Sequence, residues 1–216
     1  MTSELRLERS LDILAIGSSS TTGVGASRPE FAYPARLQDA LRDGLGRNEV
    51  SVVNAGVSGE TAEATVARLE ESVRGGTVDL VLWQVGTNDA VRGGDETRFR
   101  ELLGRGIRAA LDAGVDIVLV DQQYFPTIKD LPRYERFVGL VADAAAEFQV
   151  PVFSRYTLMK AWGAADPAHL RGMLAEDGFH LGDGGYRCMA QVLGYAIVAR
   201  AVPPVEATVV AQRPRR

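Results

Sequence analysis

Short runs of apolar and branched residues alternate along this chain with longer segments of helical periodicity. The apolar runs lie at residues 11–17, 49–56, 78–86, 115–122 and 150–154. The helical segments lie at residues 34–45, 60–73, 96–114, 135–148 and 185–202. Strands that are apolar throughout need cover on both faces, which a parallel sheet between two layers of helices provides. The alternation therefore predicts a three-layer α/β fold with a central parallel sheet of about five strands.

The chain is long enough for one substantial domain. Its 216 residues are 46% hydrophobic and 24% charged, which is ordinary for a globular protein with a single core. We expect an N-terminal extension over 1–10, the domain over 11–202, and a tail over 203–216 that carries prolines and ends in arginines.

Composition argues against several classes of function. The formal net charge of −4 gives no basic field, and no nucleic-acid-binding motif is present, so nucleic acid is not an expected partner. One cysteine and two histidines are too few for a zinc site of ordinary spacing, and Cys188 is interpreted as an inert thiol in the last helix. We therefore expect neither a metal nor a cofactor.

The first ten residues alternate charge with leucine and lack the apolar run of a signal peptide. No later segment is apolar enough to span a bilayer. The sequence thus predicts a soluble cytoplasmic protein, or a secreted or periplasmic one if a signal peptide has been removed.

Parallel α/β sheets bind ligands at the carboxyl ends of their strands, so the residues that follow each apolar run are the candidates for chemistry. The first run is followed by a hydroxyl-rich stretch, GSSSTTG, from Gly17 to Gly23. Its serines could cap a helix, supply a nucleophile or cradle a phosphate. Neither the Gly-Lys-Ser/Thr ending of a nucleotide-binding loop nor a GxGxxG fingerprint is present.

Two further strand ends carry hydrogen-bond donors. Gly56 lies at the end of the second run and Asn88 follows the third. Either residue alone is typical of a turn, but together they would place a backbone N–H and a side-chain amide beside the first loop. Fixed donors of this kind can stabilise the negative oxygen of a tetrahedral intermediate, which is the requirement for an oxyanion hole.

Two histidines compete for the role of general base. His180 follows Asp177 by three residues and precedes the last helical segment, whereas His169 follows Asp166 at the same spacing in a charged context with no strand before it. A serine nucleophile needs a base near neutral pH and a partner that orients that base. Context favours His180 as the catalytic residue and His169 as a surface or lid residue.

Four short blocks in this order resemble those of the SGNH (GDSL-type) serine hydrolases. The blocks are GSSSTTG (17–23), NAGVSGET (54–61), GTND (86–89) and DGFH (177–180). The resemblance extends from about residue 11 to the final helix and implies the flavodoxin-like fold of that family, with carboxylic esters hydrolysed through an acyl-enzyme.

The resemblance also implies a role for each matching residue. Ser19 would be the nucleophile, His180 and Asp177 would complete the triad, and Gly56 and Asn88 would join the Ser19 N–H in the oxyanion hole. The expected partner is a small-molecule ester. Where the family usually has Gly-Asp-Ser, this chain has serine at position 18, so a catalytically inactive relative is an alternative, as is a flavin- or phosphate-binding protein of the same fold.

Other residues near the strand ends allow simpler interpretations. Trp83 is expected in the core, while Gln84 beside it could face the site. The segment from Tyr124 to Tyr134 could form a wall of an acyl or alcohol pocket, or a plain connection.

Overall fold

A computed structural model describes residues 10–46 and 49–201 of the chain. Its centre is a five-stranded, all-parallel sheet with the strand order β2-β1-β3-β4-β5. The strands are β1 (Leu11–Gly17), β2 (Val50–Gly56), β3 (Leu80–Gln84), β4 (Asp116–Val120) and β5 (Val152–Phe153). The predicted three-layer fold with a sheet of about five parallel strands is therefore confirmed.

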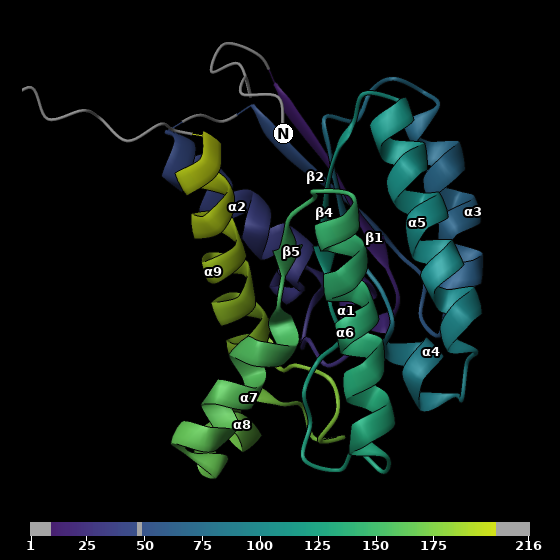
Figure 1. The fold of residues 1–216 in the computed structure, drawn as a ribbon. Helices are drawn as coiled ribbons and strands as arrows, with labels where there is room; N and C mark the ends of the chain where they lie inside the picture. The colour runs from purple at the N-terminus through teal and green to yellow at the C-terminus, as the bar shows by residue number, and fades with distance from the viewer. Residues whose placement is uncertain (1–9, 47–48, 202–216) are drawn as a thin grey trace, which may run out of the picture.

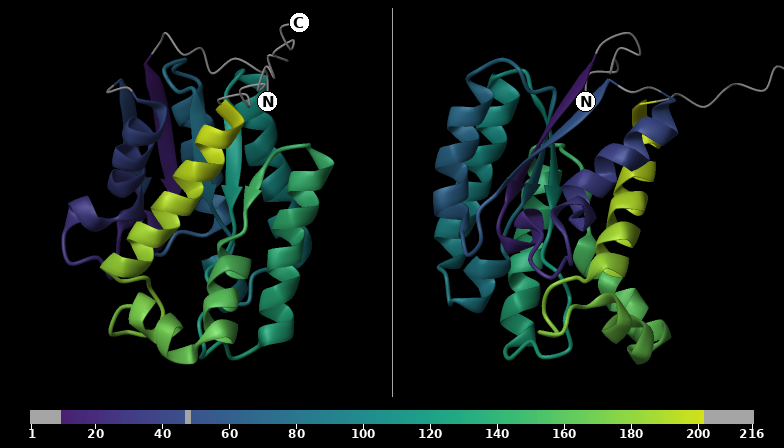
Figure 2. Two further views of the ribbon diagram at one scale, coloured as in Figure 1. Left: turned by 90° about the vertical axis from the view of Figure 1, so that its left-hand side faces the viewer. Right: turned by 180° about the vertical axis from the view of Figure 1, so that it is seen from behind.

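Helices cover both faces of this sheet (Figures 1 and 2). One face carries α3 (Ala62–Val73), α5 (Glu96–Asp112) and α6 (Leu131–Glu147). The other carries α2 (Tyr33–Leu45) and α9 (Asp183–Ala201), with α7 (Arg155–Ala165) and α8 (Pro167–Met173) beside the lower end of α9 in Figure 1. Three short elements complete the fold: α1 (Ser19–Thr22), α4 (Thr87–Val91) and the 3-10 turn η1 (Pro29–Phe31).

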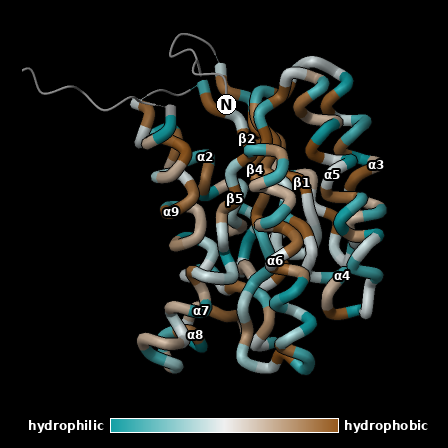
Figure 3. Tube along the Cα trace, in the orientation of Figure 1, coloured by the Kyte–Doolittle hydropathy of each residue, from teal (hydrophilic) through white to brown (hydrophobic). Residues whose placement is uncertain are grey.

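Each layer of helices encloses its own apolar core. Alternate residues of β1 and β3 point to opposite faces, so Ile16 and Trp83 pack toward α5 and α6, whereas Ala15 and Leu82 pack toward α2 and α9. Figure 3 shows the hydrophobic strands running through the middle of the molecule, between helices in which hydrophilic and hydrophobic residues are mixed. Trp83 is completely buried, as the sequence predicts.

The structure differs from the sequence expectations mainly in short helices. Residues 155–173, for which no element was expected, form α7 and α8, and the hydroxyl-rich stretch after β1 contains the four-residue α1. Ser154 and Asp166 cap α7 and α8 by accepting from the N–H groups of Thr157 and Ala168. These caps are a local signal that apolar periodicity does not contain.

The ends of the chain remain outside this description. The expected extension over 1–10 is described only at Ser10, and the expected tail over 203–216 lies outside the described residues. The proposed domain boundaries therefore stay predictions. Within residues 10–46 and 49–201, no helix is long and apolar enough to cross a membrane.

Cys188 lies half-buried in α9, and burial raises the pKa of its thiol. A raised thiol pKa keeps the group protonated and poorly nucleophilic. This environment agrees with the interpretation of Cys188 as inert.

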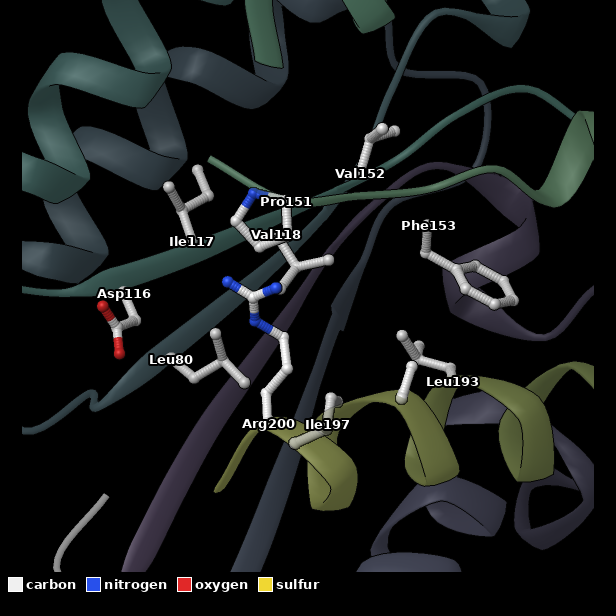
Figure 4. A pocket seen from close by; sticks show the side chains of 11 residues that line it. Leu80, Asp116, Ile117, Val118, Pro151, Val152, Phe153, Leu193, Ile197 and Arg200 are labelled. Atoms are coloured by element: carbon white, nitrogen blue, oxygen red, sulfur yellow. The ribbon is translucent and has the colours of Figure 1, made fainter. Parts of the chain in front are cut away.

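An apolar cavity of about 90 Å³ opens at the edge of the sheet where β3, β4 and β5 begin (Figure 4). Its walls include Leu80, Val118, Phe153 and Leu193, and Arg200 of α9 reaches across it. The carboxyl ends of the strands lie at the opposite edge, so this cavity is separate from the candidate active site.

Candidate active site

Ser19 is the first residue of α1, and only Ser18 separates it from the end of β1. The turn into α1 passes close to the end of β3, because a Cβ on Gly17 would lie only 2.6 Å from the carbonyl oxygen of Gln84. Glycine is therefore required at this close approach. The carbonyl of Ser18 accepts from the N–H groups of Thr21 and Thr22, and α1 ends at Gly23 in the left-handed region. The short helix fixes Ser19 at the carboxyl edge of the sheet.

His180 lies next to Ser19, although 161 residues separate the two in the chain. The Nε2 atom of His180 is 2.8 Å from Ser19 Oγ, and its Nδ1 atom is 2.6 Å from Asp177 Oδ2. One imidazole thus bridges a hydroxyl and a carboxylate. With Nδ1 protonated and donating to Asp177, Nε2 is free to accept the hydroxyl proton.

Asp177 is held in place by its own turn. Its Oδ1 accepts from the backbone N–H groups of Phe179 and His180, each at 2.9 Å. Partial burial raises the pKa of this carboxyl, but the bonds from the His180 ring and from both N–H groups outweigh burial and hold the pKa below its usual value. Asp177 is therefore ionised at neutral pH and can stabilise a positive imidazolium.

Asn88 lies in α4, at the carboxyl end of β3. Its Nδ2 donates one hydrogen to the carbonyl of Glu60 at 2.7 Å, which orients the amide and leaves its second N–H free. The neighbouring Asp89 accepts from the N–H of Ala62 with both carboxylate oxygens, at 3.1 and 3.2 Å. Asp89 thereby ties α4 to the start of α3, while Asn88 ties it to the turn over residues 56–61.

The two glycines of that turn differ in their hydrogen bonds. The N–H of Gly56 donates to Oδ1 of Asn54 at 3.0 Å, so the donor expected from the sequence is already engaged. Gly59 has φ of +85°, and its N–H has no hydrogen-bond partner among residues 10–46 and 49–201. It directly precedes Glu60, whose carbonyl holds Asn88.

A cavity of about 480 Å³ adjoins this group of residues. Phe179 forms one wall and contacts both His180 and Phe125 edge to face, with ring centroids 4.7 Å apart in each pair. Ala90 of α4 and Tyr134 of α6 lie on other walls. The part of the expected segment from Phe125 to Tyr134 lines this cavity, and its role as the wall of an acyl or alcohol pocket stays a prediction.

Much of the backbone of the hydroxyl-rich stretch is engaged within the protein, which argues against a phosphate cradle there. The N–H groups of Thr21, Thr22 and Gly23 all donate back to carbonyls of α1 and its cap. A cradle needs such groups free and pointing outward.

His169 is exposed on α8, where Asp166 accepts from the N–H of Ala168 and caps the helix. Among residues 10–46 and 49–201, no group of three or more His, Cys, Asp or Glu side chains could hold a metal ion.

Several residues of this site are weakly marked in the sequence. Gly59, Asp89 and Gln84 each belong to the site or hold it together, but the sequence indicates a place near the site only for Gln84. Gly59 is the second glycine of NAGVSGET, and Asp89 is the acid of GTND. Their place within these two blocks is the sequence signal that could have marked them as site residues.

The fold and the four blocks define the class of this protein, an SGNH-type hydrolase, and enzymes of this class act on ester bonds. The model of the non-GDSL lipase-like family matches residues 1–202. The chain belongs to that family. The resemblance found in the sequence is thereby confirmed.

Curated relatives and solved structures agree with this assignment. The chain is 28% identical to an arylesterase of Vibrio mimicus over 73% of its own length and 78% of the relative. It is also 28% identical to the esterase TesA of Pseudomonas aeruginosa, covering 78% of each chain. In structure it is similar to a crystal structure of TesA, with a TM-score of 0.74 and 23% identity over 88% of this chain and 99% of that one. An acetyl xylan esterase, AlAXEase, has a TM-score of 0.77 at 20% identity over 87% of this chain and 100% of that one.

A buried carboxyl beside the site gives a prediction about stability. Asp121 follows β4, accepts from the N–H of Tyr156 and the hydroxyl of Ser154, and has its pKa raised to about 6 by burial. A group that binds its proton more tightly when folded destabilises the protein as pH rises from its unfolded pKa to its folded pKa. We therefore expect Asp121 to cost the wild type about 2 to 3 kcal/mol of unfolding free energy between about pH 4 and pH 6.

Asp121→Asn removes this titration, since an amide can accept from Tyr156 and donate to Ser154. Chemical denaturation at a series of pH values measures the effect. The stability of the variant relative to wild type should increase by about 2 to 3 kcal/mol from pH 4 to pH 7. Parallel stability curves for the two proteins would contradict the raised pKa.

Proposed function

We propose that this enzyme hydrolyses small carboxylic esters through an acyl-enzyme on Ser19, with a Ser19-His180-Asp177 triad. The observation that carries the proposal is the continuous pair of short contacts from Ser19 Oγ to the His180 ring and from that ring to Asp177, at 2.8 and 2.6 Å. The nucleophile Ser19, the base His180 and the orienting group Asp177 are thus in contact in the sequence that this chemistry requires.

The first half of the reaction forms the acyl-enzyme. His180 Nε2 takes the proton of Ser19 as its oxygen attacks the ester carbonyl, and Asp177 stabilises the resulting imidazolium. The imidazolium then gives the proton to the leaving alcohol as the tetrahedral intermediate collapses. In the second half, water attacks the acyl group, loses its proton to the same nitrogen, and releases the acid and free Ser19.

The negative oxygen of the intermediate needs fixed donors. We assign two of them to the backbone N–H of Ser19 and the free side-chain N–H of Asn88. A third comes from the turn over residues 56–59. Gly56, the donor expected from the sequence, can serve only if its N–H leaves Asn54. Gly59 requires no such exchange, and its neighbour Glu60 holds Asn88, so we favour Gly59 for this role.

The adjoining cavity supports a compact acyl or aryl group as the substrate moiety. Its volume of about 480 Å³ lies within the range of small-molecule pockets, and Phe125 and Phe179 give it an apolar wall next to His180. Lys129, Asp130 and Arg133 form its polar rim.

Labelling with a fluorophosphonate, combined with a panel of p-nitrophenyl esters of increasing chain length, tests the proposal. We expect hydrolysis of short esters, inactivation by the probe in proportion to labelling, and a modified peptide that contains Ser19. A colourless protein is also expected, whereas a yellow, unlabelled protein would support the flavin-binding alternative. Failure of the probe to label Ser19 would overturn the proposal.

Asn88→Ala is expected to lower kcat by about 100-fold or more with little change in KM. The amide is proposed to bind charge that exists only in the transition state, and removal of one such donor costs a factor of this size. Steady-state kinetics on p-nitrophenyl acetate measures it. A variant whose main defect is a raised KM would assign Asn88 to substrate binding instead.

Asn54→Ala is the matched variant that separates the two glycine donors. If Gly56 donates to the oxyanion, removal of its competitor should raise kcat. If Gly59 is the donor, kcat should stay at the wild-type value, because the exposed Asn54 side chain bonds only to the N–H of Gly56 among residues 10–46 and 49–201.

A further inference from the structure

Gln84 ends β3, directly behind the nucleophile turn, and its side chain is 2% exposed. Its Oε1 atom receives three donors from that turn. They are the backbone N–H of Ser18 at 3.0 Å, the hydroxyl of Ser18 at 3.1 Å and the hydroxyl of Thr21 at 3.3 Å. The orientation of the amide follows from chemistry, since the backbone N–H of Ser18 can only donate and must face an oxygen.

These bonds hold Ser18, which precedes the nucleophile, and Thr21, which follows it by two positions. The bonds to Ser18 fix the peptide that leads into Ser19, and the bond to Thr21 fixes the far side of the first turn of α1. The absent side chain of Gly17 makes room for this contact, because a Cβ there would lie 2.8 Å from the Cβ of Gln84. The direction of the Ser19 Cα–Cβ bond is thereby held on both sides.

We propose that Gln84 is the positioning residue of the nucleophile, and that Ser18 and Gln84 form a matched donor–acceptor pair. This inference rests on the proposed role of Ser19. It also accounts for the serine at position 18, because a hydroxyl can donate to Oε1, whereas an aspartate carboxylate there would face it as a second acceptor. Neutral partners thus anchor the turn without a buried charge.

Gln84→Met tests the proposal, because methionine keeps the length and approximate volume of the side chain but has no strong acceptor. We expect kcat and the rate of fluorophosphonate labelling to fall by about 10- to 100-fold with KM close to wild type, since a displacement of about 1 Å at a reacting group has effects of this size. Gln84→Glu restores an oxygen acceptor and should recover most of that loss.

Gln122→Met is the matched control. Gln122 is also a completely buried glutamine at the carboxyl edge of the sheet, but its amide has no hydrogen-bond partner among residues 10–46 and 49–201. Its replacement should leave the labelling rate of the folded enzyme unchanged. Thermal unfolding of each variant separates loss of stability from loss of rate per folded molecule.

The outcomes distinguish this inference from the proposed function. Wild-type enzyme that is not labelled at Ser19 overturns both. Labelled wild type together with a folded Gln84→Met that reacts at the same rate overturns the positioning role alone, as does a Gln84→Glu variant that is as slow as Gln84→Met. If Gln84→Met does not fold, Gln84→Asn applies the same test, because it withdraws the oxygen by one methylene while keeping the amide.

Discussion

Ser19→Ala is expected to lose at least about three orders of magnitude in kcat while its fold stays intact. Covalent catalysis depends on one oxygen, and the loss of a nucleophile leaves only the residual acceleration from binding and the oxyanion donors. Ester hydrolysis by purified variants measures the rate, and circular dichroism with thermal unfolding measures the fold.

Neighbouring hydroxyls in α1 supply the controls for this prediction. Ser20 is buried and its Oγ lies 3.4 Å from Oε1 of Gln123, so Ser20→Ala should cost much less than Ser19→Ala. Ser18→Ala removes one of three bonds to Gln84 but keeps the backbone donor, so its loss should also stay small. If Ser18→Ala were as damaging as Ser19→Ala, the assignment of the nucleophile would be wrong.

His180→Ala is expected to abolish most of the activity and, with it, the fall in kcat/KM toward acidic pH. The imidazole accepts the Ser19 proton only when it is neutral, so protonation in acid stops the first step. Burial raises the pKa of the Asp177 carboxyl, but its bonds to the His180 ring and to two backbone N–H groups hold that pKa below its usual value, so loss of the carboxylate charge should not cause this fall at mildly acidic pH. The pH profiles of wild type and variant measure the effect.

His169→Ala is the matched control, since both histidines follow an aspartate by three residues. His169 is exposed and stacks edge to face against Trp162, with ring centroids 6.1 Å apart. Its removal should leave the pH profile of kcat/KM unchanged. An inactive His169→Ala beside an active His180→Ala would overturn the proposed triad.

The sequence predicts most of the sheet because its signals are local. β1 has the predicted bounds, 11–17, and the other four strands lie within or at the edges of the predicted runs. Continuous apolar runs indicate strands covered on both faces, and the helical periods between them require parallel connections. The short α7 and α8 escaped prediction because caps at Ser154 and Asp166 define them more than an apolar stripe does.

The chemical type of the site could also be predicted, since four short blocks carry its residues in order. Ser19, Asn88, Asp177 and His180 lie at strand ends or just before the last helix, where a parallel sheet gathers its functional groups. Spacing in the chain separates His180 from the alternative His169 only by context. The 2.8 Å contact between Ser19 and His180 depends on tertiary structure, in which the start of α9 is tied to the loop after α1 by bonds from Ser27 to Asp183 and from Tyr186 to the carbonyl of Val24.

Only the tertiary structure decided which donors are free and which acceptors hold the nucleophile. The N–H of Gly56 is engaged by Asn54, and the three bonds to Gln84 join residues 63 to 66 positions apart. Hydrogen bonds depend on distance and direction within tenths of an ångström, and these are set by strand register and packing. A sequence motif specifies which groups are present, whereas the folded chain determines which of them already have partners.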